Sequence, residues 1–211
     1  MKKMIAMFLS LMLLVGMFAE IPAVSAASYN GPVPDGVYNI VSYLDQTKVV
    51  DISAMSSDNC ANVQLWDRNF CAAQDFQLIR HPAGWYLIVN IHSWKALDVA
   101  GGVSAGGQNV WQYDINYSAA QRWYLEDAGG GWFYIRSALG YYLDVSGACT
   151  TNGTNIQIWE KNGCGAQKYR FEAKTSYSTK VSEFLANMDH KNGATWGYYQ
   201  KPLFSSPTGI G

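Results

Sequence analysis

Three aspartates recur at fixed distances from an aromatic residue and a glutamine. The aspartate and the aromatic residue are 15 positions apart in Asp51 and Trp66, Asp98 and Tyr113, and Asp144 and Trp159. The glutamine follows the aspartate by 23 positions, at Gln74, Gln121 and Gln167. A carboxylate accepts strong charge-assisted hydrogen bonds, and an aromatic ring offers a flat apolar surface. The pattern therefore favours non-covalent binding of a ligand that has polar and apolar faces.

The sequence offers no pattern for covalent or metal chemistry. His81, His92 and His190 are scattered and form no ligand cluster. Asp189 and His190 are adjacent, but no cysteine follows Cys164 to act with them as a thiol nucleophile. We therefore expect a protein that is not an enzyme and that uses no metal or other cofactor.

The aspartates belong to three copies of a longer pattern, whose period is 47 and then 46 residues. Each copy has an aromatic and β-branched opening segment, an apolar-Asp-apolar triplet, a segment around the aromatic residue, and a segment after the glutamine. These segments have the length and alternation of short strands, and one four-stranded unit cannot bury a core alone. The sequence therefore predicts an all-β domain with pseudo-threefold symmetry over residues 35–174, with repeats at about 35–82, 83–129 and 130–174.

Composition restricts the partners. Charged residues make up 15% of the chain, aromatic residues make up 14%, and the formal net charge is −1 at pH 7. The basic residues form no run, whereas binding to nucleic acid relies on clustered Lys and Arg. We therefore expect no nucleic acid partner.

The beginning of the chain has the pattern of an export signal. Lys2 and Lys3 precede an apolar run over residues 4–18, and Ala26 is the small residue before the expected cleavage site. The run is short for a membrane span. The sequence predicts a signal peptide at 1–26, a linker at 27–34, a secreted extracellular protein and no stable membrane insertion.

Four cysteines lie in the predicted domain, and an even count in a secreted chain favours disulfides. Their spacings do not match the short cysteine pairs of zinc sites. Cys60 and Cys71 lie in the first repeat, and Cys149 and Cys164 lie in the third. We expect each pair to form a disulfide within its own repeat, and the other two connectivities stay open.

The repeated pattern resembles the ricin B-type lectins, in particular the bacterial secreted modules of that family. The resemblance rests on the apolar-Asp-apolar triplets, on the Asn-Val-Gln-Leu-Trp segment at 62–66, and on a closing Gln-x-aromatic in each repeat. It covers roughly residues 35–174. It implies a β-trefoil fold, followed here by a short C-terminal tail, and carbohydrate binding without metal.

The resemblance also implies one shallow sugar pocket in each repeat. The aspartate would accept hydrogen bonds from two sugar hydroxyls, the ring would stack on the apolar sugar face, and amides would complete the contacts. The first pocket is expected at Asp51, Gln64, Trp66, Asn69 and Gln74. The second is expected at Asp98, Tyr113, Asn116 and Gln121. The third is expected at Asp144, Gln157, Trp159, Asn162 and Gln167.

Two departures from the family pattern modify these expectations. Trp111 stands where the other repeats have Gln64 and Gln157, so we expect the second pocket to lack one polar contact. Alanine precedes each closing glutamine, where many members of the family have asparagine. The third pocket keeps the most family positions, and the second lacks both the glutamine and a cysteine pair, so we expect affinity to fall in the order third, first, second. Because degenerate repeats are common in trefoils, we expect one or two working pockets rather than three.

Every candidate residue also has a purely structural interpretation. The aspartates could stabilise turns, the mid-repeat tryptophans could be buried, and the closing glutamines could hold the backbone of a loop. The aromatic residues that follow the glutamines are expected in the core, at Phe76, Trp123 and Tyr169.

Residues 175–211 do not continue the repeat. They resemble only faintly the start of cell-wall amidase or peptidase domains, so we interpret them as a linker or as the truncated start of a second domain. Three functions are compatible with the sequence: a carbohydrate-binding lectin module, the targeting part of a cell-wall hydrolase, and a protein-binding trefoil. The same residues recurring three times favour the first. We expect a monomer whose partner is a cell-wall, plant or host polysaccharide or glycan.

Overall fold

The structure is a computed structural model that describes residues 32–174. The predicted signal peptide at 1–26 and tail at 175–211 lie outside the described residues, as does the predicted linker up to residue 31. Within residues 32–174, no helix is long and apolar enough to span a membrane.

Each repeat contributes four strands to the described domain. The first repeat forms β1 (Gly36–Ser42), β2 (Lys48–Ile52), β3 (Val63–Asp67) and β4 (Phe76–Arg80). The second forms β5 (Tyr86–Asn90), β6 (Ala96–Val99), β7 (Gln108–Tyr113) and β8 (Trp123–Gly129). The third forms β9 (Trp132–Ser137), β10 (Tyr142–Val145), β11 (Thr154–Trp159) and β12 (Lys168–Ala173).

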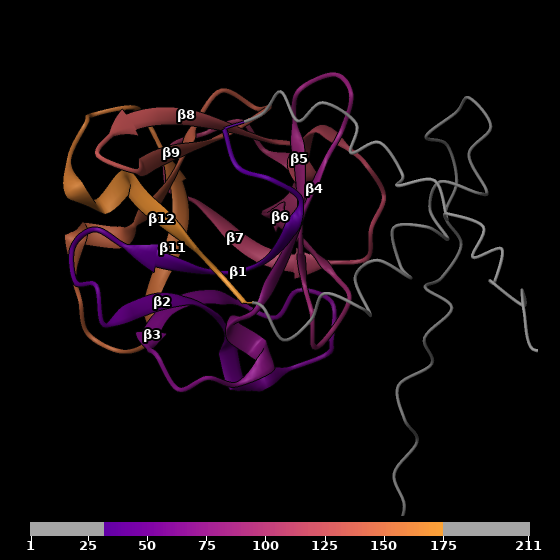
Figure 1. Cartoon of the computed structure of the whole chain (residues 1–211). Coiled ribbons are helices and arrows are strands. Elements are labelled where there is room, and N and C mark those ends of the chain that lie inside the picture. The colour runs from indigo at the N-terminus through magenta and orange to yellow at the C-terminus, as the bar shows by residue number, and fades with distance from the viewer. Residues whose placement is uncertain (1–31, 175–211) are drawn as a thin grey trace, which may run out of the picture. The chain divides into compact units, whose positions relative to one another are not determined.

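The first and last strands of the repeats close into a ring of antiparallel pairs. Within the repeats, β1 pairs with β4, β5 with β8, and β9 with β12. Between the repeats, β4 pairs with β5, β8 with β9, and β12 with β1. Figure 1 shows the last strand, β12, lying beside the first, β1. Closure of the ring leaves none of these six strands as an open edge.

The middle strands of the repeats form three hairpins that meet one another. These hairpins are β2–β3, β6–β7 and β10–β11, and β11 also pairs with β3 and β7. Equivalent asparagines join them: Asn62 donates from Nδ2 to Asn155 Oδ1 over 2.9 Å, and Asn109 donates from Nδ2 to Asn62 Oδ1 over 3.0 Å. A six-stranded barrel with three hairpins is the β-trefoil predicted from the repeats, and that prediction is confirmed.

The core contains the aromatic residue that ends each Gln-x-aromatic motif, as expected. Phe76, Trp123 and Tyr169 are fully buried. The polar ends of the last two are satisfied, since Trp123 Nε1 donates to Leu97 O and Tyr169 Oη donates to Ala166 O. Large buried rings dominate the packing of such a core. Because each ring lies two positions after its glutamine, the packed ring also fixes the place of the glutamine.

Two short 3-10 helices in each repeat bring the aspartate strand close to the glutamine. One set follows the aspartate strands: η1 (Ser53–Met55), η3 (Ala100–Gly102) and η5 (Ser146–Ala148). The other set contains the glutamines: η2 (Ala72–Gln74), η4 (Ala119–Gln121) and η6 (Gly165–Gln167). The two helices of each repeat contact each other. Each aspartate strand also contacts the 3-10 helix that contains the glutamine of its repeat.

Neither expected disulfide is present in the structure, because all four cysteines are free thiols. The backbone N–H of Cys60 donates to Gln112 O in the second repeat, whereas Cys71 precedes η2 in the first. Cys60 therefore lies on the contact between two repeats. Cys149 Sγ lies 3.3 Å from Thr151 Oγ1, and this hydrogen bond lowers the pKa of the Cys149 thiol to about 7.

Candidate functional site

The three aspartates lie on equivalent strands and are almost completely buried. Asp51, Asp98 and Asp144 are each 5% exposed. Each has a cross-strand partner on the second strand of its own hairpin, at Gln64, Trp111 and Gln157 respectively. Because cross-strand partners project to the same face of a hairpin, their side chains can donate directly to the carboxylate.

In the first repeat, both oxygens of the carboxylate accept a side-chain hydrogen bond. Gln64 Nε2 donates to Asp51 Oδ1 over 2.9 Å, and Gln74 Nε2 donates to Asp51 Oδ2 over 3.0 Å. A buried charge of this kind is tolerated only when it is paired or hydrogen-bonded. The two glutamines therefore fix the orientation of the carboxylate at the floor of the pocket.

The closing glutamine of each repeat also holds the backbone of the loop that precedes it. Gln74 accepts from Asn69 N and donates to Asp67 O, at 2.9 and 2.8 Å. The other repeats have the same arrangement, in which Gln121 bonds Asn116 N and Asp114 O, and Gln167 bonds Asn162 N and Glu160 O. All three glutamines are fully buried. The structure thus places them behind the aspartates, where they position the pocket instead of lining it.

The second repeat supplies its aspartate with a different donor. Trp111 Nε1 donates to Asp98 Oδ1 over 2.8 Å, and Gln121 also bonds this carboxylate. In the third repeat the donors to Asp144 are Gln157, over 3.2 Å, and Gln167. The indole N–H therefore supplies Asp98 with the donor that the amide supplies to the other aspartates, whereas the expected loss of one polar contact to the ligand stays a prediction.

Burial changes the acidity of all three carboxyl groups. It raises the pKa of Asp51, Asp98 and Asp144 above the ordinary value, and the hydrogen bonds from neighbouring side chains oppose the rise. Desolvation of this kind disfavours the charged form. The ionised carboxylate that remains is a poorly hydrated acceptor, which suits a ligand that brings its own hydroxyl donors.

The candidate asparagines lie at the outer edge of the pockets. Asn69, Asn116 and Asn162 are exposed. The side-chain oxygen of each accepts a backbone N–H two positions later, from Cys71, Ser118 and Cys164. Because the oxygen is engaged, each asparagine keeps its Nδ2 group as the donor that a ligand can use.

The mid-repeat aromatic residues form the outer wall, and their exposure differs. Trp159 is 43% exposed and Tyr113 is 36% exposed, whereas Trp66 is half-buried. The interpretation that the tryptophans belong to the core therefore does not hold for Trp159. An exposed ring beside a buried carboxylate is an arrangement for stacking a flat ligand, since the ring loses little conformational entropy on binding.

Each outer wall is completed by the hairpin turn of a neighbouring repeat, a feature that the sequence analysis missed. Gly107 N donates to Ile158 O over 2.8 Å, and Gly153 N donates to Leu65 O over 2.9 Å. A Cβ added to Gly107 would lie 3.2 Å from the ring of Trp159, and one added to Gly153 would lie 3.7 Å from that of Trp66. The turns thus support the rings, and every pocket is built from two repeats.

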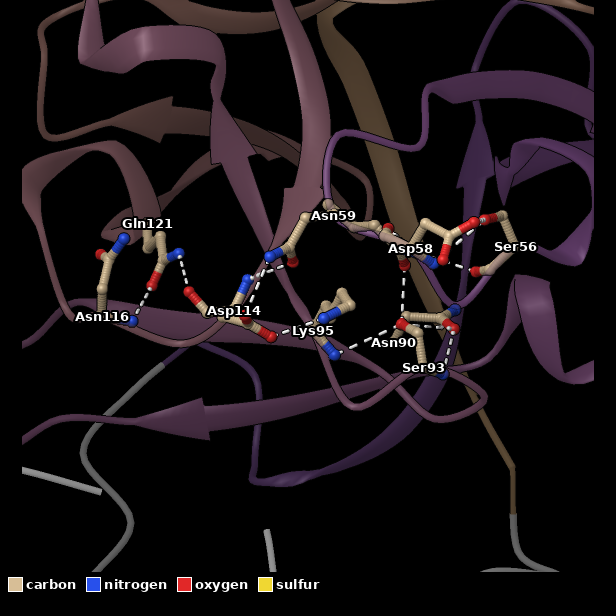
Figure 2. Close-up of polar contacts among 10 residues, drawn as sticks. Ser56, Asp58, Asn59, Asn90, Ser93, Lys95, Asp114, Asn116 and Gln121 are labelled. Carbon is tan, nitrogen blue, oxygen red and sulfur yellow. Dashed lines mark hydrogen bonds and ion pairs between the residues drawn. The ribbon is translucent and has the colours of Figure 1, made fainter. Parts of the chain in front are cut away.

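Polar clamps lock two of these inter-repeat contacts. In Figure 2, Asp114 of the second repeat bonds Lys95 and, from the first repeat, Asn59. Asp67 bonds Lys48 and Asn152 in the same way. These hydrogen bonds lower the pKa of both carboxyl groups. The sequence carried a signal for the clamps, because in both cases a lysine precedes the aspartate by 19 positions.

The third pocket has no such clamp at the equivalent positions. Gly106 takes the place of the asparagine, Glu160 that of the aspartate, and Tyr141 that of the lysine. A Cβ added to Gly106 would lie 3.7 Å from both Tyr141 and Trp159. Aromatic packing therefore replaces polar locking around Trp159. Among the described residues there is also no group of three or more His, Cys, Asp or Glu side chains that could hold a metal ion.

Comparisons with known proteins agree with this architecture. Residues 72–159 match the family described as "Ricin-type beta-trefoil lectin domain-like". The designed three-fold symmetric protein ThreeFoil is 31% identical, with a TM-score of 0.65 over 66% of this chain and 100% of that chain. An exo-β-1,3-galactanase from Clostridium thermocellum is also 31% identical, with a TM-score of 0.64 over 67% of this chain and 31% of the galactanase.

A more distant structure has the same fold. The ricin B-like lectin of Macrolepiota procera, solved in complex with lactose, is 21% identical, with a TM-score of 0.58 over 67% of this chain and 99% of the lectin. No curated protein sequence matches the chain. The three repeated pockets, the trefoil and the family match agree, and the chain belongs to the ricin-type β-trefoil lectin-like family.

Proposed function

We propose that this chain binds carbohydrate through the pockets of Asp51, Asp98 and Asp144, and that it does so without catalysing a reaction. The observation that carries the proposal is the recurrence, in all three repeats, of a buried and oriented carboxylate beside a mid-repeat aromatic ring. Together, such a carboxylate and ring can bind the hydroxyls and the apolar face of one sugar.

The chemistry of a pyranose fits the two halves of each pocket. Adjacent hydroxyls donate to the two oxygens of the aspartate, and a hydrogen bond to a charged acceptor is about twice as strong as a neutral one. The apolar C–H face of the sugar lies on the ring of Tyr113, Trp159 or Trp66. The exposed asparagine donates from its Nδ2 group to a further hydroxyl.

Galactose-containing glycans are the first ligands to test. One relative was solved with lactose and another is an exo-β-1,3-galactanase, and lactose and galactan both contain galactose. A single weak site gains effective affinity when several sites on one body bind one polymer. We therefore propose a polysaccharide or a clustered glycan as the partner.

A glycan array probed with residues 27–211, followed by calorimetric titration, tests the proposal. The Asp144→Ala variant loses one charged acceptor and should bind the best array ligand more weakly at that pocket. Asp127→Ala is the matched control, because Asp127 is an exposed carboxylate at the β8–β9 turn, away from the pockets. Equal loss in both variants, or no glycan binding by the folded wild type, would refute the proposed function.

A second function is that of a targeting module for an enzyme. It is favoured by the galactanase, of which this chain spans 31%. The test is co-sedimentation of the chain with insoluble polysaccharides, together with an assay for release of reducing sugar. Sedimentation without sugar release supports a targeting or lectin role, and sugar release would contradict the proposal that the chain is not an enzyme.

We also propose that the protein is exported, on the basis of the signal-peptide pattern at 1–26. Protein collected from the culture medium should begin at Ala27. An intact Met1 in protein that stays inside the cell would contradict this.

A further inference from the structure

Trp111 has two roles that no residue of the other repeats combines. It stands at the position of Gln64 and Gln157, and its indole N–H donates to Asp98 as their amides donate to Asp51 and Asp144. Unlike an amide, however, it also adds a large ring to the pocket.

That ring lies next to the aromatic wall. Trp111 and Tyr113 are two positions apart on β7, so their side chains project to the same face of the strand. Their ring centroids are 6.3 Å apart and their planes are within 27° of parallel. Tyr113 is 36% exposed and Trp111 is partly exposed. The second pocket thus has a second ring at the position where the first and third have a glutamine.

We infer that the second pocket is a paired subsite that binds two consecutive sugar residues of a galactan-type chain. The inference rests on the proposed function and concerns only how much of a chain one pocket holds. Asp98 would anchor the hydroxyls of one sugar, whose apolar face lies on one ring, and the next sugar of the chain would lie on the other ring.

The contacts give Asp98 and the ring of Trp111 different roles. Asp98 accepts a hydrogen bond from Trp111 Nε1 within the protein, so the carboxylate is already oriented and would select a sugar by its hydroxyls. The added ring brings apolar surface whose only polar atom, Nε1, already bonds Asp98. The ring of Trp111 therefore increases the affinity for longer ligands. Its contribution should appear as a preference for oligosaccharides over the monosaccharide.

Two variants of Trp111 separate its ring from its donor. Trp111→Gln installs the residue of the other repeats, which keeps an N–H donor for Asp98 and removes the ring. Trp111→Phe keeps a ring and removes the donor. Both variants are made in a background protein that also carries Asp51→Asn and Asp144→Asn, so that the measured affinity is that of the second pocket. The probes are galactose, β-1,3-galactobiose and β-1,3-galactotriose, titrated by calorimetry.

The readout is the ratio of galactotriose affinity to galactose affinity. We expect Trp111→Gln to lower this ratio roughly two- to tenfold, which is the value of one aromatic contact. Trp111→Phe should preserve the ratio while lowering the affinity for all three probes. A ratio that is unchanged in Trp111→Gln, or a background protein that binds none of the probes, would overturn the inference.

A different result would refute the proposed carbohydrate binding itself. If the wild-type chain binds no glycan at all, the function itself is refuted. If the wild type binds but the background protein does not, only the role of the second pocket is refuted, because the first and third pockets account for the binding.

Discussion

The second and third pockets are alike at their inner ends and different at their outer ends. Inside, each has an aspartate that is 5% exposed, a fully buried closing glutamine and a fully buried aromatic residue two positions later. Outside, the second pocket has two aromatic rings and a polar clamp, whereas the third has Gln157, an exposed Trp159 and a glycine turn.

The difference between inner and outer ends arises because water can hydrogen-bond exposed polar groups but not buried ones. A buried carboxylate or amide that loses its partner is left unsatisfied, so the inner residues must fit one another as a set. At the rim, solvent can replace a lost hydrogen bond, and exposed ion pairs contribute little. The repeats are therefore free to differ at the rim, which is where a ligand distinguishes one pocket from another.

The largest effects should come from the buried aromatic residues. Trp123→Ala and Tyr169→Ala each remove a large, fully buried ring and should lower the free energy of unfolding by roughly 3–5 kcal/mol. The two values should be similar because the inner ends are alike. Denaturant unfolding provides the measurement, with Tyr113→Ala as the rim control. If Tyr113→Ala lowered the free energy of unfolding as much as the two core variants, the proposed difference between inner and outer ends would be wrong.

Substitution of the buried glutamines should cause the next largest loss of stability. Gln121→Ala and Gln167→Ala each remove one of the donors to an aspartate and leave a loop N–H and a loop carbonyl without their partner. Each should lower the free energy of unfolding by about 2–4 kcal/mol. If urea denaturation finds either variant as stable as wild type, the glutamines do not organise the pockets.

Acidification should affect stability and binding in opposite directions. The folded-state pKa of each pocket aspartate is raised by burial, so its favourable contribution to stability is present at low pH and is lost as the pH rises through that pKa. Sugar hydroxyls need the charged acceptor, so affinity should fall about tenfold per pH unit below that pKa. Titrations from neutral pH downwards should show the loss beginning above the ordinary value of 3.8. Affinity that stays constant down to that value would contradict the role of the carboxylates.

The smallest effect should come from the clamp, which only the first and second pockets have. Lys95→Met removes the cation beside Asp114, whose side chain is 67% exposed, and should change the free energy of unfolding by no more than about 1 kcal/mol. The matched change in the third pocket is Tyr141→Met. Thermal unfolding of the two variants would sharpen the comparison, and a large loss for Lys95→Met would mean that the clamp is part of the inner structure.

The fold could be predicted because its signals are local and repeated. A Gln-x-aromatic motif at a fixed distance from an aspartate identifies a strand pair and a core ring, and three copies imply closure around an axis. The inner residues of the pockets followed from the same spacing. The aromatic residues that follow the glutamines were expected in the core, and Phe76, Trp123 and Tyr169 are fully buried.

The rest could not be predicted because it depends on contacts between repeats. The turn at Gly107 supports Trp159 from far along the chain, and no spacing within one repeat reveals that. The role of Trp111 was missed for another reason. Its replacement of a glutamine looked like the loss of a polar group, yet the indole N–H reaches Asp98 as the amide would.

The most direct test of the account is to neutralise all three pocket carboxylates together. The triple variant Asp51→Asn, Asp98→Asn and Asp144→Asn keeps the size of each side chain and removes its charge. We expect near-UV circular dichroism like that of wild type, and affinity for the best array glycan reduced about tenfold or more, since a hydrogen bond to a charged acceptor contributes roughly 1.5–3 kcal/mol. A folded triple variant that binds this glycan as tightly as wild type would contradict the account.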